Sequence, residues 1–213
     1  MAGQTRIHVL VALSLSAMVA GCSLFSTRTP EPPDTASTFI WIPATTPQLL
    51  MSNLTGTLNL LDASDYIRVF VSSADSTSSG QKTFSFTPAP GLDQNSQSIF
   101  ANWSVQSEQA WVQKLSSILP ANSQLIVTLS NSVSDQSGGS NAATYSADYV
   151  ISIPTSGSSS ALPSVVQGSF QMQLALVTTD QGTKEWRIVS WSDFPPHTGT
   201  GPTWTNLKVQ LSS

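Results

Sequence analysis

A pair of long apolar stretches near the C-terminal end of the chain places the strongest constraint on its fold. From Phe170 to Leu176 every second residue is apolar, which is the period of a half-buried β-strand. Residues 179–183 interrupt this pattern with polar residues and a glycine, as a turn does. The next stretch, 185–192, has large apolar groups on both faces, so we expect it to be covered on both sides rather than to form a sheet edge. This hairpin predicts a single domain of the α+β class.

The preceding stretches alternate between helical and strand periods. Thr46 and Pro47 are a typical helix start, and leucines recur at helical spacing from Leu50 to Leu61. A short second helix is predicted around 66–71, after an acidic interruption at 62–65. The remaining predicted elements are a strand at 82–87, a helix at 104–119 that Pro120 ends, and strands at 123–129 and 144–153. The predicted order is therefore helix, helix, strand, helix, and four strands joined as an antiparallel meander.

Residues 1–21 have the pattern of an export signal. One cation, Arg6, precedes an apolar stretch that ends at Ala20, shorter than the roughly 20 residues that a membrane span needs. The sequence Val-Ala-Gly-Cys at 19–22 resembles the bacterial lipobox, with Val in place of the more usual Leu. That resemblance implies that Cys22 carries lipid and begins the mature protein. The alternative is an ordinary secretory signal with a chance cysteine; we favour lipidation because Cys22 is the only cysteine in 213 residues.

The single cysteine also bears on stability. Exported domains often use disulfides, but once Cys22 carries lipid no thiol remains for a disulfide, a catalytic thiolate or a Cys-ligated metal. We therefore expect an apolar core to stabilise the domain. Residues 22–44 include Pro30, Pro32 and Pro33 and are predicted to form the lipidated Cys and a Pro-rich tether. The domain is predicted at 45–213. The apolar patch at 39–43 is expected to dock onto it, and a partner-binding epitope is the alternative.

The low charge of the chain bears on its partners. Without residues 1–21 the chain has seven cations and twelve anions, a net charge of −5. Charged residues are 9% of the chain, against about a quarter in an average soluble domain. We therefore predict no nucleic-acid binding, and we expect membrane attachment through the lipid anchor alone. Ser23 is not the Asp associated with inner-membrane retention. The chain thus resembles outer-membrane lipoproteins of the bacterial cell envelope, facing the periplasm or the cell surface.

The order of elements across about 46–208 resembles the nuclear-transport-factor-2-like (cystatin-like) superfamily. The resemblance rests on the helix pair that ends Tyr-Ile-Arg-Val-Phe at 66–70, the strand Phe-Ser-Phe-Thr at 84–87, the helix at 108–119, the final strand pair and the tail Thr-Trp-Thr-Asn-Leu-Lys at 203–208. It implies a curved antiparallel sheet wrapped around N-terminal helices to make a cone. The superfamily includes isomerases, dehydratases, transport adaptors and assembly factors, so the fold alone does not select a function.

Enzymes of this superfamily place an Asp or His in the cone as a general base, with Tyr or acidic groups as hydrogen-bond donors. The candidate pocket residues here are Tyr66, Trp103, Asp148, Trp191 and Asp193. Each also has an ordinary structural explanation. Asp148 has the opposite strand parity to Tyr145 and Tyr149, which predicts a solvent-facing side chain. Asp193 is expected to cap a loop or to pair with an arginine, Arg187 or Arg68, and the tryptophans to belong to the core.

Other familiar site patterns are missing from the sequence. His197 is the only histidine after the export signal and lies in a Pro/Gly-rich stretch without a neighbouring ligand cluster, so we expect no metal site and no cofactor. The glycines at 199 and 201 do not follow a predicted strand-to-helix turn, and no nucleophile elbow is present.

Two functional hypotheses follow. The first is a non-catalytic binding or scaffolding module in the envelope, acting through the cone or the exposed sheet face, with a homodimer or an envelope protein as possible partners. The second is an isomerase- or dehydratase-type enzyme that uses an Asp in the cone, such as Asp148 or Asp193. The enzyme hypothesis fails if no ionisable side chain points into the cone, or if Trp and Leu fill it.

Overall fold

The computed structural model describes residues 39–77, 80, 83–136, 140–154 and 162–212. These residues all belong to one compact unit, Ala36–Ser213. The predicted export signal, Cys22 and residues 23–38 of the predicted tether lie outside the described residues.

Four long strands form the body of the sheet, β3 (Ile126–Asp135), β4 (Ala142–Ser152), β5 (Val165–Thr178) and β6 (Lys184–Phe194). Each pairs antiparallel with the next, so the predicted meander is confirmed. The burial of five consecutive residues of β6, 185–189, and the position of β6 between β5 and β2 confirm that this strand is covered and not at the edge.

Two short strands complete the sheet and make it mixed rather than purely antiparallel. β2 (Ser85–Thr87) pairs parallel with β6, and β1 (Ser76–Thr77) pairs antiparallel with the end of β5. Because helices and three strands separate β2 from β6 in the chain, no hairpin turn imposes an antiparallel direction on this pair.

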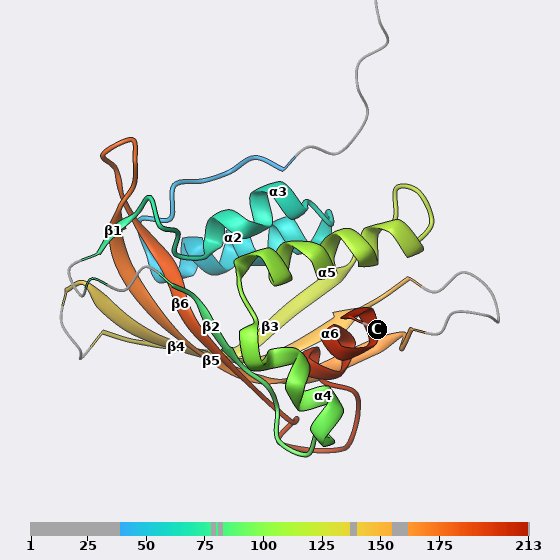
Figure 1. Ribbon diagram of the computed structural model, residues 1–213. Coiled ribbons are helices and arrows are strands. Elements are labelled where there is room, and N and C mark those ends of the chain that lie inside the picture. Colours follow the sequence, from blue (N-terminus) through green and yellow to red (C-terminus); the bar gives the residue numbers. More distant parts are fainter. Residues whose placement is uncertain (1–38, 78–79, 81–82, 137–139, 155–161, 213) are drawn as a thin grey trace, which may run out of the picture. The chain divides into compact units, whose positions relative to one another are not determined.

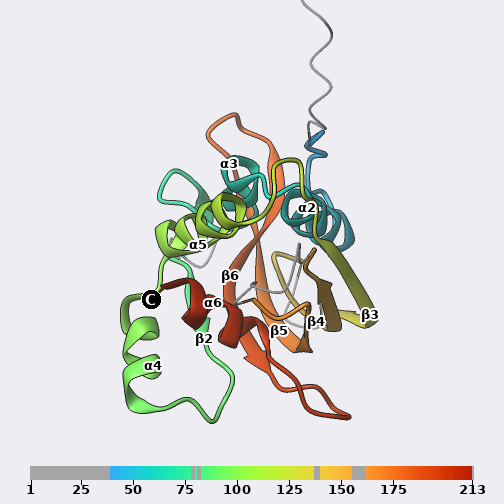
Figure 2. The ribbon, with the colours of Figure 1, turned by 90° about the vertical axis from the view of Figure 1, so that its right-hand side faces the viewer.

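Helices cover one side of the curved sheet. α2 (Pro47–Asn59), α3 (Ala63–Tyr66) and α5 (Val105–Ile118) lie above it in Figure 1, and η1 (Ile67–Val69) continues α3. The C-terminal helix α6 (Trp204–Ser212) contacts both α5 and β5 (Figure 2). The predicted α+β class, with a curved sheet against helices, is confirmed.

The predicted helix starts are confirmed by their caps. Thr46 Oγ1 accepts from the Leu49 amide at the start of α2, and Asp62 accepts from two amides at the start of α3. Ser104 begins α5 with a capping box. The structure adds α4 (Gln94–Ile99) and η2 (Phe100–Asn102) between the predicted strand and the predicted third helix, where no element was predicted; Asp93 caps α4.

Residues 39–44 pack on the domain as an extended segment. The Asn53 side chain bonds both the amide and the carbonyl of Ile42, and Ala44 O accepts from the Trp186 amide on β6. The Phe39 ring lies against Gly56, where a side-chain Cβ would collide with it. The glycine in α2 therefore provides the space for this segment, at a cost in helix propensity of about 1 kcal/mol.

Candidate functional site

Large side chains fill the space between the helices and the sheet. The largest fully buried residues are Trp111, Trp191, Trp204, Tyr66, Tyr149, Phe70 and Phe170. Their rings pack edge-to-face in several places, with Trp191 and Trp204 only 4.5 Å apart between centroids. The interior of the predicted cone is thus occupied by the chain's own side chains.

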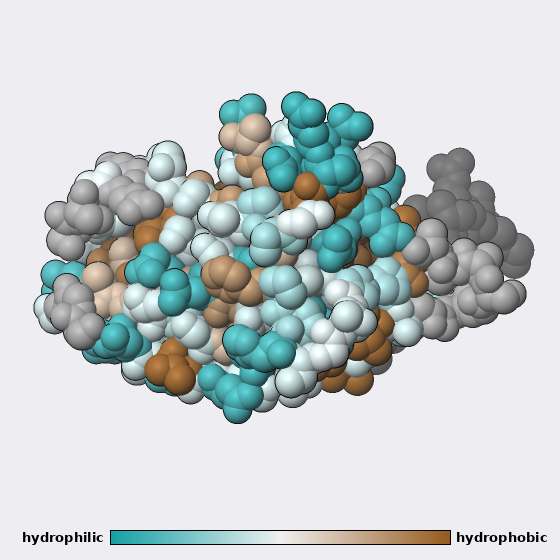
Figure 3. Space-filling model, turned by 90° about the horizontal axis from the view of Figure 1, so that it is seen from below, coloured by the Kyte–Doolittle hydropathy of each residue, from teal (hydrophilic) through white to brown (hydrophobic). Residues whose placement is uncertain are grey.

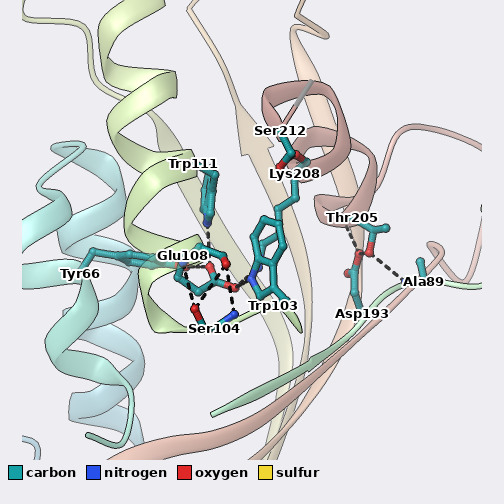
Figure 4. Close-up of polar contacts among 11 residues, drawn as sticks. Tyr66, Ala89, Trp103, Ser104, Glu108, Trp111, Asp193, Thr205, Lys208 and Ser212 are labelled. Carbon is teal, nitrogen blue, oxygen red and sulfur yellow. Dashed lines mark hydrogen bonds and ion pairs between the residues drawn. The ribbon is translucent and has the colours of Figure 1, made fainter. Parts of the chain in front are cut away.

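A fully buried carboxylate lies among these rings. Glu108 Oε2 accepts from the Tyr66 hydroxyl at 2.8 Å and from Trp111 Nε1 at 2.7 Å. Its Oε1 accepts from Trp103 Nε1 at 2.6 Å and from the ammonium of Lys208 (Figure 4). Four donors, two on each oxygen, therefore satisfy this carboxylate.

Helical spacing explains how Glu108 and Lys208 come to be buried. Glu108 precedes Trp111 and Val112 by three and four residues and so lies on the apolar stripe of α5. Lys208 follows Trp204 by four residues and lies on the apolar stripe of α6. Each helix thus places one charge, of opposite sign, on the face that packs into the core.

Aromatic rings surround the Lys208 ammonium. Nζ lies 3.8 Å from the ring centroid of Phe86 and 4.5 Å from that of Trp191, with Trp103 and Trp111 at 5.4 and 5.8 Å. Rings at this range attract a cation through their negative faces. Burial lowers the pKa of Lys208, against the opposing effects of Glu108 and Asp193. Burial, and then the charge of Glu108, raise the pKa of Tyr66 well above its usual value, so Tyr66 is a hydroxyl donor at any physiological pH.

Asp193 is the centre of a second buried cluster. Its Oδ1 accepts from the Tyr149 hydroxyl, and its Oδ2 accepts from the amide and the hydroxyl of Thr205 in the first turn of α6. Tyr149 Oη in turn accepts from the Trp204 amide. Burial raises the pKa of Asp193. Asp193 therefore anchors the start of α6, and the loop cap or arginine pair expected from the sequence is replaced by these contacts.

A glycine makes room for this cluster. A Cβ at Gly168 would lie 2.5 Å from Tyr149 Oη, inside van der Waals contact. Only a glycine lets β5 pass this close to the hydroxyl that links Asp193 to α6.

The structure separates one of the five candidate pocket residues from the rest. Tyr66, Trp103, Trp191 and Asp193 all lie in the interior. Asp148 lies outside it, half-buried, where it accepts from Asn131 Nδ2 and lies 3.4 Å from His197 Nε2. The strand parity predicted this position. Sequence reasoning missed Glu108 and Lys208, although a charge on the apolar stripe of each helix was the available signal.

An open hollow lies apart from this interior, beside η1 and the start of α5. Its volume is about 800 Å³, and its lining includes Phe70, Phe84, Gln106 and five charged groups. The charged groups are Arg68, Asp75, Asp180, Glu185 and Arg187. Arg187 Nη1 donates to Glu185 Oε2 at 2.7 Å, and the guanidinium of Arg68 lies 4.1 Å above the Trp41 ring. The hollow therefore combines mixed charge, amide and hydroxyl groups, and aromatic rings.

Neither a metal site nor a membrane span was found in the part of the chain that the structure describes. No group of three or more His, Cys, Asp or Glu among the described residues could hold a metal ion. No helix among them is long and apolar enough to cross a membrane.

The two buried clusters offer different chemistry. Asp193 is a carboxylate with a raised pKa, but its hydrogen-bonding positions are taken by Tyr149 and Thr205. Glu108 and Lys208 form a dry acid–base pair with hydrogen-bond donors already aimed at the carboxylate. In both clusters the partners of the ionisable groups are the chain's own residues. The hollow, in contrast, opens to the outside: Arg68, Gln106 and Asp180 on its lining are exposed, whereas Asp75, Glu185 and Arg187 are largely buried.

Comparison with known proteins gives structural neighbours only. No family model and no curated protein matches the chain. A protein of unknown function with a cystatin-like fold from Nostoc punctiforme is 9% identical, with 69% of this chain and 86% of that chain covered and a TM-score of 0.42. An NTF-2-like protein from Shewanella oneidensis is 11% identical (68% and 93% covered, TM-score 0.43).

A nuclear transport factor 2 (NTF2-like) superfamily protein from Salmonella enterica is 14% identical, with 71% of this chain and 89% of that chain covered and a TM-score of 0.42. These descriptions name the fold type that the order of elements in this chain resembles. With TM-scores below 0.5, the similarities carry no argument about function.

Proposed function

We propose that the chain is a lipid-anchored exported lipoprotein whose α+β domain is a non-catalytic binding module of the bacterial cell envelope. Cys22 carries the lipid, and Ser23 directs the protein to the outer membrane. The observation that best supports a non-catalytic role is the filled interior. Trp111, Trp191 and Trp204 fill the space between the helices and the sheet.

The hollow beside η1 is the proposed binding site of the module. Its volume of about 800 Å³ is in the range of small-molecule sites. Two arginines and the carboxylates of Asp75, Asp180 and Glu185 line it, so it suits a small polar molecule with groups of both signs and does not suit a polyanion. On the face shown in Figure 3 the apolar areas are small and separated by polar ones, so this face offers less for binding an apolar partner.

The anchor is tested with an alkyne analogue of palmitate. We expect cells fed the analogue to label the wild-type chain and to leave Cys22→Ser unlabelled, with the variant moving from the membrane fraction to the soluble envelope fraction. Equal labelling of both chains would exclude Cys22 as the lipidated residue.

The binding site is tested by native mass spectrometry of the full chain isolated from its own envelope in mild detergent. We expect a small-molecule adduct on the wild type. Gln106→Trp, which fills the hollow, removes the adduct, and Gln171→Trp, on an exposed position of β5, keeps it. An adduct that survives Gln106→Trp places the site elsewhere, and a wild-type chain without any adduct contradicts the proposal.

An enzyme with Asp193 as its base is the second candidate, and it requires the tryptophans that fill the interior to make room for a substrate. A buried carboxylate with a raised pKa is the observation in its favour, because such groups concentrate at catalytic sites. The two candidates differ in the fate of the bound molecule. A binding module releases it unchanged, whereas an isomerase or dehydratase releases an isomer or a molecule that has lost water, and Asp193→Asn prevents that change.

A further inference from the structure

The contact between Glu108 and Lys208 joins two distant parts of the chain. These residues are 100 positions apart and lie on α5 and α6, and both side chains are fully buried. They bring an amine and a carboxyl group into direct contact in a space that is lined by aromatic rings. The only cysteine of the chain is Cys22, so a disulfide cannot link α5 to α6.

We propose that Lys208 Nζ and Glu108 Cδ become joined by an amide bond, so that the folded domain carries an internal Lys–Glu cross-link. The proposal is independent of the binding function proposed above. It assigns a covalent modification to two side chains that otherwise form only an ion pair.

The surroundings of Glu108 suit this reaction. Lys208 contacts Oε1, while the Tyr66 hydroxyl and Trp111 Nε1 both donate to Oε2. Attack of the amine on Cδ moves negative charge onto Oε2, so these two donors have the position of an oxyanion hole. Holding the amine and the carboxyl group in contact raises their effective concentration by many orders of magnitude, and the rings of Phe86 and Trp191 exclude water.

The step balances without a co-reactant. The Lys208 ammonium first transfers one proton to Oε1, which leaves a neutral amine and a neutral carboxylic acid. Burial lowers the pKa of Lys208 and so favours the neutral amine, which is the nucleophile. The nitrogen lone pair then attacks Cδ, and the C=O electron pair moves to Oε2. When the C=O bond re-forms, the Cδ–Oε1 bond breaks, and a second proton passes from the nitrogen to Oε1, which leaves as water.

The product suits the dry interior better than the ion pair does. An amide carries no charge, so two buried charges and their desolvation cost disappear. The amide oxygen, the former Oε2, keeps its hydrogen bonds from Tyr66 and Trp111. Trp103 Nε1 loses its acceptor on Oε1, which is the structural cost of the reaction.

Tryptic peptide mapping of the full chain under denaturing conditions tests the proposal. Trypsin cuts after Lys82, Lys114 and Arg187, so Glu108 lies in peptide 83–114 and Lys208 in peptide 188–213 if the cross-link blocks cleavage at 208. We expect these two peptides to appear as one species, lighter than their sum by one water molecule. Fragmentation then assigns the bond to Glu108 and Lys208.

Two controls separate the reaction from an artefact. Lys208→Arg keeps the charge but cannot form this amide, so the peptides appear separately with peptide 188–208 released. A wild-type chain that is synthesised and kept in denaturant also gives separate peptides, because the reaction depends on the fold. A folded wild-type chain with separate peptides of full mass overturns the proposal. A water loss confined to peptide 188–213, which contains Asp193, overturns the assignment to Glu108.

Discussion

Two acid–base pairs in this domain use the same chemistry in opposite surroundings. Glu108 and Lys208 meet in the interior with side chains 0% exposed. Asp65 and Arg68 meet beside the hollow with side chains 24% and 46% exposed. Water replaces a lost partner at the surface, but nothing replaces it inside. The comparison teaches that burial, and not the presence of an ion pair, decides how much of the domain depends on it.

The pair of Glu185 and Arg187 lies between these extremes. Its side chains are 10% and 9% exposed, and it borders the hollow. We therefore expect the effects of substitutions to rank with burial, whatever the sign of the charge that is removed.

Lys208→Met is expected to have the largest effect. It leaves the Glu108 carboxylate buried without its cation, which costs about 3–5 kcal/mol of the free energy of unfolding relative to a chain that keeps the ion pair without the amide bond. Urea unfolding measures the loss, and Lys114→Met, on the exposed side of α5, is the matched control. The double variant Glu108→Gln/Lys208→Met should lose less than Lys208→Met alone, because no charge is left unpaired. A loss under about 1 kcal/mol for Lys208→Met would contradict this expectation, because it would equal the cost of breaking an exposed ion pair.

Asp193→Asn should have the next largest effect. It weakens the bonds from Tyr149 and Thr205 and should cost about 2 kcal/mol at neutral pH. The pKa of Asp193 is raised on folding, so the folded state holds this proton more tightly than the unfolded state does. The contribution of Asp193 to stability therefore grows as the pH falls from neutral toward the unfolded pKa near 3.8.

The measurement for Asp193 is the difference in unfolding free energy between the wild type and Asp193→Asn at several pH values. It should grow in favour of the wild type on acidification. Asp180→Asn, which removes an exposed charge, should show no such trend. A difference that shrinks on acidification would mean that the fold stabilises Asp193 as a carboxylate.

Glu185→Gln should have an intermediate effect of about 1–2 kcal/mol, because Arg187 is buried and loses its charged partner. The remaining bond from Arg187 Nη1 to the Trp186 carbonyl limits the loss. Thermal unfolding detects a change of this size. If Glu185→Gln lowered the free energy of unfolding as much as Lys208→Met does, the effect of a substitution would not depend on whether the pair lies in the interior or beside the hollow.

Asp65→Asn should have the smallest effect, about 0.2–1 kcal/mol, since the pair with Arg68 is largely solvated. Salt should reduce even this difference, because mobile ions screen exposed charges. Urea unfolding at low and high salt measures both quantities, and a cost that is large and independent of salt would contradict the ranking.

Local patterns predicted much of the fold. Caps at Thr46, Asp62 and Ser104, the helical leucines and the alternation in the last four strands each depend on neighbours within a few positions. The two-sided apolar pattern at 185–192 correctly indicated a covered strand. The parallel pairing of β2 with β6 depends on a strand about 100 positions away, and no local pattern specifies such a partner.

The interior site was harder to predict for the same reason. The stripe of α5 contains Glu108 and that of α6 contains Lys208, but α6 was not recognised as a helix, so neither charge had a visible partner. Tyr66, Trp103 and Trp191, selected from the sequence as possible pocket residues, are buried in the interior. The carboxylate of Glu108 and the amine of Lys208 link these residues. Neither link is apparent until the two helices are packed together.

The position of α6 in the chain also bears on the timing of folding. α6 is made after every other described element, yet it supplies Trp204, Leu207 and Lys208 to the core and binds Asp193. Before α6 leaves the ribosome, Glu108 lacks its cation, and the aromatic rings around it lack the α6 side chains that pack against them. Folding that proceeds from the N-terminus during synthesis therefore stops short of the native core. The packing of α5, β6 and α6 around Glu108 and Asp193 is therefore a late step in the folding of this domain.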